Sequence, residues 1–400
     1  MTRVRALVML LALGVAGACQ EELAAPTECP ELCPGLSLII RDTTLLANQD
    51  QDSSFTGYVG AQEMSALLIS DGINAGEARA FATYPKRPDS VTVGGSTLPL
   101  TVDSVALTVN LLARDSTLGG LKLFLHRIAP DRDTTVTLAD VDAMLTPATL
   151  IDSVVISDTL KRGTIRLVLP ANKLDLLIGA GSDSGRLGIG YRIKAAEPTG
   201  IRIGSLFSVS GGPLLIAYGR VAVIDTALQR QTLTVPAEKA NYVIEVPAVS
   251  GNDRLVVGGK LGTRSILRFT IPPAVRDSAT IIRATLELTP AVPIRGLRND
   301  PAALQVRGVL VDLGAKSPVL ANLSVTTPSR ANDTAVQEVE VLSIVSAWLG
   351  KDNFVPTVLL MGIAPEGGSF GRPEFFSSRS GTGAPGLRIT YALPSRPGHP

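Results

Sequence analysis

Short runs of Val, Ile, Leu and Thr, broken by Gly, Pro, Asp, Asn or Ser roughly every eight to twelve residues, make up the chain beyond residue 36. Within residues 266–271 and 281–288, apolar and polar side chains alternate, so each strand would turn one face to a core and the other to water. Helical spacing is rare and is clearest in residues 339–350, around Trp348. This periodicity predicts an all-β fold of antiparallel sheets, arranged as jelly-roll-like β-sandwiches.

The two halves of the chain present the same features in the same order. Each half has a strand that ends at a proline, then two further strands, and finally a closing strand that contains a tyrosine. These segments are residues 78–85, 102–109, 121–126 and 214–218 in the first half, and residues 265–272, 279–286, 304–309 and 387–391 in the second. The repeat predicts two tandem modules, residues 41–230 and 233–395, joined near residues 229–235 and followed by a flexible tail at 396–400.

Residues 1–18 are typical of an export signal. Residues 1–5 contain two arginines, and residues 6–15 form an apolar run too short to span about 30 Å of hydrocarbon. The Val-Ala-Gly-Ala-Cys segment that ends at Cys19 resembles a bacterial lipobox, which implies a lipoprotein anchored through several acyl chains on Cys19. Gln20 favours the outer membrane or cell surface over the inner membrane. An ordinary secretory signal beside an unmodified cysteine is the alternative.

Residues 19–40 are Pro-rich and polar, which predicts a tether between the lipid and the folded part. Cys29 and Cys33 lie in this segment, and in an exported chain two such thiols most simply form a local disulfide. A metal site would need about four ligands, and no histidine or further cysteine lies beside this pair.

The composition excludes several classes of function. Lys and Arg number 37 against 36 Asp and Glu, so the net charge is +1 and no basic field exists to bind nucleic acid. With 2 His and 3 Cys in 400 residues, His-based catalytic triads and multi-cysteine zinc sites are nearly excluded. The expected partners are the membrane, through the lipid anchor, and a polysaccharide or another surface protein.

Several motifs of the second half occur in an order that resembles the DNRLRE-domain family. They are residues 252–259 (NDRLVVGG), 264–269 (RSILRF) and 279–288 (ATIIRATLEL), the helix around Trp348, and residues 375–379 before 385–389. This family comprises β-sandwich modules of bacterial surface and secreted proteins, related to certain carbohydrate-binding modules. The resemblance covers residues 233–393 and implies a non-catalytic protein of adhesion, polysaccharide binding or scaffolding at the cell envelope.

Aromatic side chains beside loops can stack on the apolar faces of sugar rings. The candidate ligand site combines such aromatics with guanidinium groups that suit a uronic acid or a sulfate. Its residues are Phe354, Phe370, Arg372, Phe375, Phe376 and Arg379. Phe375 and Phe376 also belong to the closing motif of the DNRLRE family, so the alternative is that at least one of them fills the sandwich core.

A polysaccharide hydrolase or lyase is the alternative from another class, because two carboxylates suffice to cleave a glycosidic bond. The candidate pairs are Asp131 with Asp133, Asp140 with Asp142, Glu338 with Glu340, and Glu366 with Glu374. The four aspartates could instead hold a structural calcium ion through their oxygens, although the glycine and the final glutamate of a recognised calcium loop are missing. Apart from that ion, no cofactor is expected.

Overall fold

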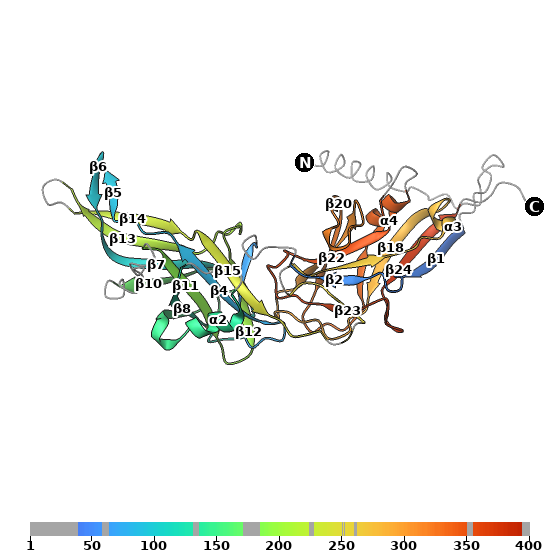
Figure 1. The fold of residues 1–400 in the computed structure, drawn as a ribbon, viewed down its shortest axis with the longest axis horizontal. Coiled ribbons are helices and arrows are strands. Elements are labelled where there is room, and N and C mark those ends of the chain that lie inside the picture. The colour runs from blue at the N-terminus through green and yellow to red at the C-terminus, as the bar shows by residue number, and fades with distance from the viewer. Residues whose placement is uncertain are drawn as a thin grey trace, which may run out of the picture.

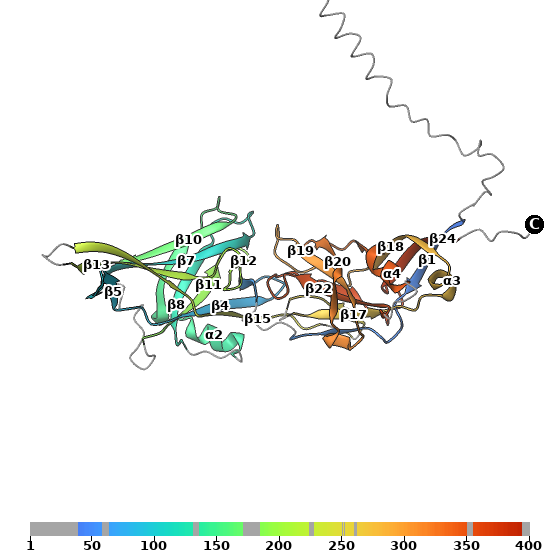
Figure 2. The same ribbon diagram turned by 90° about the horizontal axis from the view of Figure 1, so that it is seen from above.

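The computed structural model describes residues 39–57, 64–130, 136–170, 185–223, 228–249, 251, 253–259, 262–349 and 355–393. These residues form antiparallel sheets with three short helices, so the predicted all-β sandwich fold is confirmed. Two sandwich modules lie end to end along the long axis of the molecule (Figures 1 and 2). Residues 1–38 and 394–400, which include the predicted signal, tether and tail with Cys19, Cys29 and Cys33, lie outside the described residues.

Module 1 contains the strands from β3 to β15. Its first sheet has the order β15 (Lys239–Glu245), β4 (Glu77–Tyr84), β11 (Leu187–Lys194), β8 (Lys122–Ile128) and β9 (Leu150–Val155). Its second sheet has the order β14 (Leu228–Pro236), β13 (Leu214–Ala222), β7 (Thr101–Arg114), β12 (Thr199–Gly204) and β3 (Ala66–Asp71), and β10 (Gly163–Pro170) also pairs with β7. A hairpin of β5 (Ser90–Val93) and β6 (Ser96–Pro99) lies at the tip far from module 2 (Figure 1). The helix α2 (Leu138–Met144) follows β8.

Module 2 contains β1, β2 and the strands from β16 to β24. One sheet has the order β1 (Ile39–Leu46), β24 (Gly386–Leu393), β18 (Thr280–Leu288) and β21 (Gln337–Glu340). The other has the order β2 (Ser53–Phe55), β17 (Arg264–Arg268), β22 (Val358–Ala364), β19 (Ala302–Val309) and β20 (Val319–Ser329). The short strands β16 (Arg254–Val256) and β23 (Glu374–Phe376) pair with each other, and two helices, α3 (Pro273–Arg276) and α4 (Leu342–Trp348), complete the module.

The predicted internal repeat is present in the strand order. β4, β7, β8 and β13 of module 1 occupy the same positions in their sheets as β17, β18, β19 and β24 of module 2. The module boundaries, however, differ from the predicted 41–230 and 233–395. The strands β1 and β2 pair within module 2, and β14 and β15 pair within module 1, so module 1 is inserted into module 2. Local periodicity identifies a strand but does not specify which distant strand will pair with it.

Each module has its own core, and the predicted helix around Trp348 contributes to the second. The helix α4 buries Trp348 to 5% exposure, and its ring lies 6.5 Å from that of Phe269. In module 1, the hydroxyls of Tyr84 and Tyr191 form a buried hydrogen bond of 3.0 Å. Burial raises the pKa of both tyrosines well above the ordinary value. Within the described chain, no helix is both long enough and apolar enough to cross a bilayer.

The junction between the modules is packed. Leu297 and Phe370 belong to loops of module 2, yet their side chains are buried in the core of module 1. The hydroxyl of Tyr242 in module 1 donates a hydrogen bond to the carbonyl of Gly367 in module 2. Such shared apolar packing holds the two modules in one relative orientation.

Candidate functional site

The predicted aromatic platform does not form on the surface. Phe370 and Phe375 are each 0% exposed, the first in the core of module 1 and the second in the core of module 2. Phe376 is half-buried, and Phe354 lies outside the described residues. A ring that is enclosed on both faces cannot stack on a sugar, so this part of the predicted site is wrong for Phe370 and Phe375.

The two arginines of the same predicted site are held by carboxylates. Arg372 is 2% exposed and lies 3.1 Å from Glu374, and burial lowers the pKa of its guanidinium below the ordinary value. Arg379 lies 3.0 Å from Asp50 and 3.6 Å from the buried Asp52. Arg372 is therefore enclosed within module 2, whereas Arg379 is exposed at its surface and engaged by Asp50 and Asp52.

Glu366 and Glu374, one of the glutamate pairs proposed for hydrolysis, are likewise held by arginines. Glu374 is 1% exposed and has the guanidinium groups of Arg254, Arg295 and Arg372 at 3.5, 2.6 and 3.1 Å. Glu366 pairs with Arg264 at 2.6 Å and also with Arg307. A buried carboxylate whose oxygens already accept from guanidinium groups has no open face toward a glycosidic bond.

Glu338 and Glu340 are exposed neighbours on one face of β21, as the period of a strand requires. Glu340 pairs with Arg283 of the adjacent strand β18 at 3.0 Å, and Glu338 pairs with Arg388 of β24, the strand beyond β18, at 3.4 Å. These ion pairs lie on the outer face of the four-stranded sheet.

The two described aspartates of the calcium candidate have structural partners. Asp140 and Thr137 form a capping box at the start of α2, with hydrogen bonds of 2.9 and 3.2 Å to each other's backbone N–H. Asp142 pairs with Arg79 at 2.7 Å, while Asp131 and Asp133 lie outside the described residues. In the residues with described positions, no cluster of three or more His, Cys, Asp or Glu side chains is arranged to hold a metal ion.

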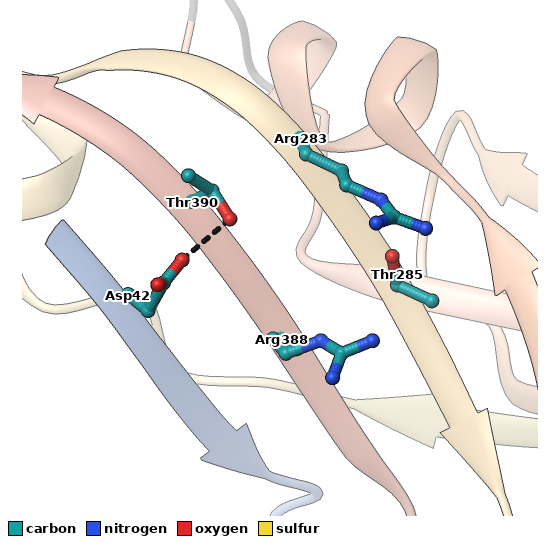
Figure 3. A pocket seen from close by; sticks show the side chains of 5 residues that line it. All are labelled: Asp42, Arg283, Thr285, Arg388 and Thr390. Carbon is teal, nitrogen blue, oxygen red and sulfur yellow. Dashed lines mark hydrogen bonds between the residues drawn. The ribbon is translucent and has the colours of Figure 1, made fainter. Parts of the chain in front are cut away.

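A shallow hollow lies on the outer face of the four-stranded sheet of module 2 (Figure 3). It is lined by Asp42 from β1, Arg388 and Thr390 from β24, and Arg283 and Thr285 from β18. The Thr390 hydroxyl donates a 2.5 Å hydrogen bond to Asp42 (Figure 3), while Arg283 pairs with Glu340 at 3.0 Å and Arg388 with Glu287 at 3.2 Å. Thr390 and Asp42 thus link β1 to β24, while Arg283 and Arg388 are held by glutamates beside the hollow.

A second hollow, of ≈ 320 Å³, lies at the junction and takes its lining from both modules. Asp115 (6% exposed) and Thr199 (2% exposed) come from module 1, and Leu297 (3% exposed) comes from module 2. The exposed side chains of Arg298 and Asn332 border the opening. Because the junction is packed, the two halves of this hollow are held together.

Several polar groups that line the junction hollow have no hydrogen-bond partner among the described residues. Asp115 Oδ1 accepts from the backbone N–H of Thr117 at 2.9 Å and from Asn299 at 3.5 Å, whereas Oδ2 accepts no hydrogen bond from the described residues. Within the same part of the chain, the side chains of Arg298 and Asn332 also make no hydrogen bond or ion pair. One carboxylate oxygen, one guanidinium and one amide therefore remain open to a ligand.

Sequence reasoning missed this second hollow. Asp115 follows β7, and Arg298 and Asn332 lie in loops of the other module, so no local motif joins them. The one available signal was their polarity in turns, which is common to most surface loops.

Comparisons with known proteins identify no family. No family model matches the chain, and no curated protein matches it. Among solved structures, it is similar to the infectious bursal disease virus Gx strain, with 8% identity, coverage of 90% of this chain and 77% of that chain, and a TM-score of 0.16. It is also similar to the tandem CBM51 modules of Sp3GH98, the family 98 glycoside hydrolase from Streptococcus pneumoniae SP3-BS71, with 8% identity, coverage of 89% and 100%, and a TM-score of 0.11.

Proposed function

We propose that this protein is a non-catalytic, lipid-anchored envelope protein whose junction hollow binds an acidic surface polysaccharide. The observation that carries the proposal is the group of unsatisfied polar atoms from Asp115, Arg298 and Asn332 around one hollow. Ligand sites occur preferentially between domains and combine an apolar floor with a few converging polar groups. The side chains of Ile73 and Leu297 provide such a floor here.

The chemistry of the hollow favours a sugar that carries a carboxylate. The free Oδ2 of Asp115 can accept from sugar hydroxyls, and the amide of Asn332 can both donate to them and accept from them. Arg298 can form a bidentate pair with the carboxylate of a uronic acid. Asp115 would repel a phosphate monoester, which carries about −1.5 to −2 charges, more strongly than a uronate with a single charge.

The attachment to the envelope rests on the lipobox resemblance at Cys19 and on the place where the body begins. Ile39 of β1 pairs with Leu393 of β24 at the end of module 2 that is opposite the junction (Figure 1). An anchor that precedes β1 would therefore attach this end to the membrane and leave module 1 and the junction on the outer part of the molecule. The DNRLRE resemblance of the second half supports the same class of protein.

The alternative function, a polysaccharide hydrolase or lyase, gains nothing from the described carboxylates. Glu366 and Glu374 are enclosed by arginines, and Glu338 and Glu340 lie in ion pairs on an open sheet face. Binding without cleavage is therefore the better supported function.

A glycan array probed with the full-length protein in detergent tests the proposal. We expect binding to uronate-containing glycans and a loss of about tenfold or more when Arg298→Ala and Asn332→Ala are combined, since a hydrogen bond to a charged group contributes about 1.5–3 kcal/mol. The matched control is Arg276→Ala, an exposed arginine of α3 that pairs with Asp277 far from the junction. An array without any bound acidic glycan, or binding that the double variant leaves unchanged, would contradict the proposed site.

A further inference from the structure

The consecutive strands β1 and β2 are the structural equivalents of β14 and β15. Each set of two is called a strand pair below, although its members lie in different sheets. Arg41 of β1 pairs with Tyr391 of β24 in module 2, just as Thr232 of β14 pairs with Tyr218 of β13 in module 1. Since β13 and β24 are the closing strands of the repeat, β14 and β1 occupy the same edge position beside them.

The second member of each strand pair obeys the same equivalence. Ser54 of β2 pairs with Ser265 of β17, and Ile244 of β15 pairs with Ala78 of β4. β4 and β17 are equivalent strands of the repeat, so β15 and β2 occupy equivalent edges of the five-stranded sheets that contain β4 and β17.

Neither strand pair completes the module whose strands come directly after it in the chain. The pair β1–β2 precedes the core of module 1 but completes module 2, whereas β14–β15 precedes the core of module 2 but completes module 1. Module 2 is thus completed by a segment from the far end of the chain, joined to the rest through residues 56–65. Ten extended residues reach at most about 33–36 Å, a span that can bridge two neighbouring molecules.

The side chains of β1 contribute little to the core of module 2, although Ala47 and Asp52, which follow β1, are buried. No side chain from Ile40 to Leu46 is buried, and these two residues are 63% and 64% exposed. Leu45 only partly packs on the core of module 2, and the side-chain link to β24 is the hydrogen bond from Thr390 to Asp42 (Figure 3). By contrast, Leu387, Ile389 and Tyr391 of the neighbouring β24 are buried in that core. Segments with few buried contacts open at the lowest free energies in a protein.

We propose that β1–β2 is an exchangeable strand pair, and that two copies of this chain dimerise by donating it to each other. β1 of one copy then pairs with β24 of the other in the same register, so every contact of the closed monomer is reproduced. Once β1 has left, the edge of β24 offers the same register to β1 of another copy, with Thr43 and Leu45 facing inward and Asp42 and Thr44 facing outward. This inference does not depend on the junction hollow, while a common membrane would raise the local concentration of copies.

Single cysteines on separate chains test the exchange directly. Full-length Asp42→Cys with one affinity tag and full-length Thr390→Cys with another, both carrying Cys29→Ser and Cys33→Ser, are reconstituted together in vesicles and oxidised. We expect a mixed disulfide that carries both tags and has twice the mass of one chain, with a yield that rises as the lipid-to-protein ratio falls. The control replaces Asp42→Cys by Thr92→Cys, which lies on the exposed hairpin of module 1 and should give no mixed product.

The double variant Asp42→Cys/Thr390→Cys shows whether the two cysteines can meet. It should close within one chain when it is oxidised in dilute detergent, since the native side chains of these positions are hydrogen-bonded. Closed molecules should then fail to dimerise in vesicles, because the donor strand is locked. Closure of the double variant without any mixed disulfide from the single variants would overturn the proposal, and so would failure of the double variant to close.

Discussion

Replacing Phe370 by alanine removes a ring that module 2 inserts into the core of module 1. The side chain is 0% exposed, and burial of an aromatic area of about 150–200 Å² at about 25 cal/mol per Å² corresponds to about 4–5 kcal/mol. The neighbouring Gly200 of β12 has no side chain that could move into the space: a Cβ built there would lie 2.9 Å from the ring. We therefore expect a loss near the 3–5 kcal/mol found for Phe→Ala in cores.

Because Phe370 of module 2 packs in the core of module 1, we also expect its replacement to separate the unfolding transition of module 1 from that of module 2. The chain has one tryptophan, Trp348, whose fluorescence reports module 2, and calorimetry reports both modules. Wild-type protein should unfold in coincident transitions, whereas in Phe370→Ala module 1 should unfold before the fluorescence of Trp348 changes. Phe375→Ala is the matched control, because that ring is also 0% exposed but lies wholly in the core of module 2.

The control should lose a similar free energy and shift the Trp348 transition itself. The reasoning would be refuted if Phe370→Ala cost less than about 1 kcal/mol, or if it left the two transitions coincident. Either result would mean that the Phe370 ring does not couple the two cores.

The other predictions concern the anchor, the buried charges and the tyrosines. Metabolic labelling with palmitate should mark the wild type and not Cys19→Ala, and equal labelling would remove the lipid anchor from the account. Glu374→Gln should destabilise the protein by about 3–5 kcal/mol in urea unfolding, because it leaves buried guanidinium groups without a counter-charge, whereas the exposed Glu340→Gln should cost less than about 1 kcal/mol; similar costs for the two variants would contradict this. Burial raises the pKa of Tyr84 and Tyr191 in the folded state, so their stabilisation is complete below pH of about 10 and is lost as the pH rises beyond it. Tyrosinate absorbance should therefore appear together with unfolding in an alkaline titration, and full ionisation of all tyrosines in a folded protein would disprove it.

Much of the fold follows from local pattern. The alternation in residues 281–288 gives β18 (Thr280–Leu288), whose Ala284, Leu286 and Leu288 are buried. The three-and-four spacing around Trp348 gives α4, because that helix has only one face to bury. Both signals lie within a dozen residues of sequence, where periodicity is informative.

Pairing between distant strands does not follow from such a pattern. Residues 39–46 form a strand, but their partner β24 begins at Gly386, and nothing in either segment specifies the other. The burial of Phe370 has the same cause: a phenylalanine in a Gly- and Ser-rich loop resembles an exposed platform until module 1 covers it. The junction hollow could not be predicted, because its polar groups come from three separate loops of two modules.

The central structural claim is that β1 and β2, the first described strands of the chain, complete module 2, whose other strands are the last in the chain. The most direct test compares the melting temperatures of two fragments that both carry Leu297→Ser and Phe370→Ser, residues 253–393 alone and residues 39–55 joined to 253–393 by a short Gly/Ser linker. The joined fragment should melt cooperatively at the higher temperature, and a separate peptide of residues 39–55 should raise the melting temperature of the shorter fragment in proportion to its occupancy. Equal melting temperatures for both fragments, with no effect of the peptide, would contradict the claim.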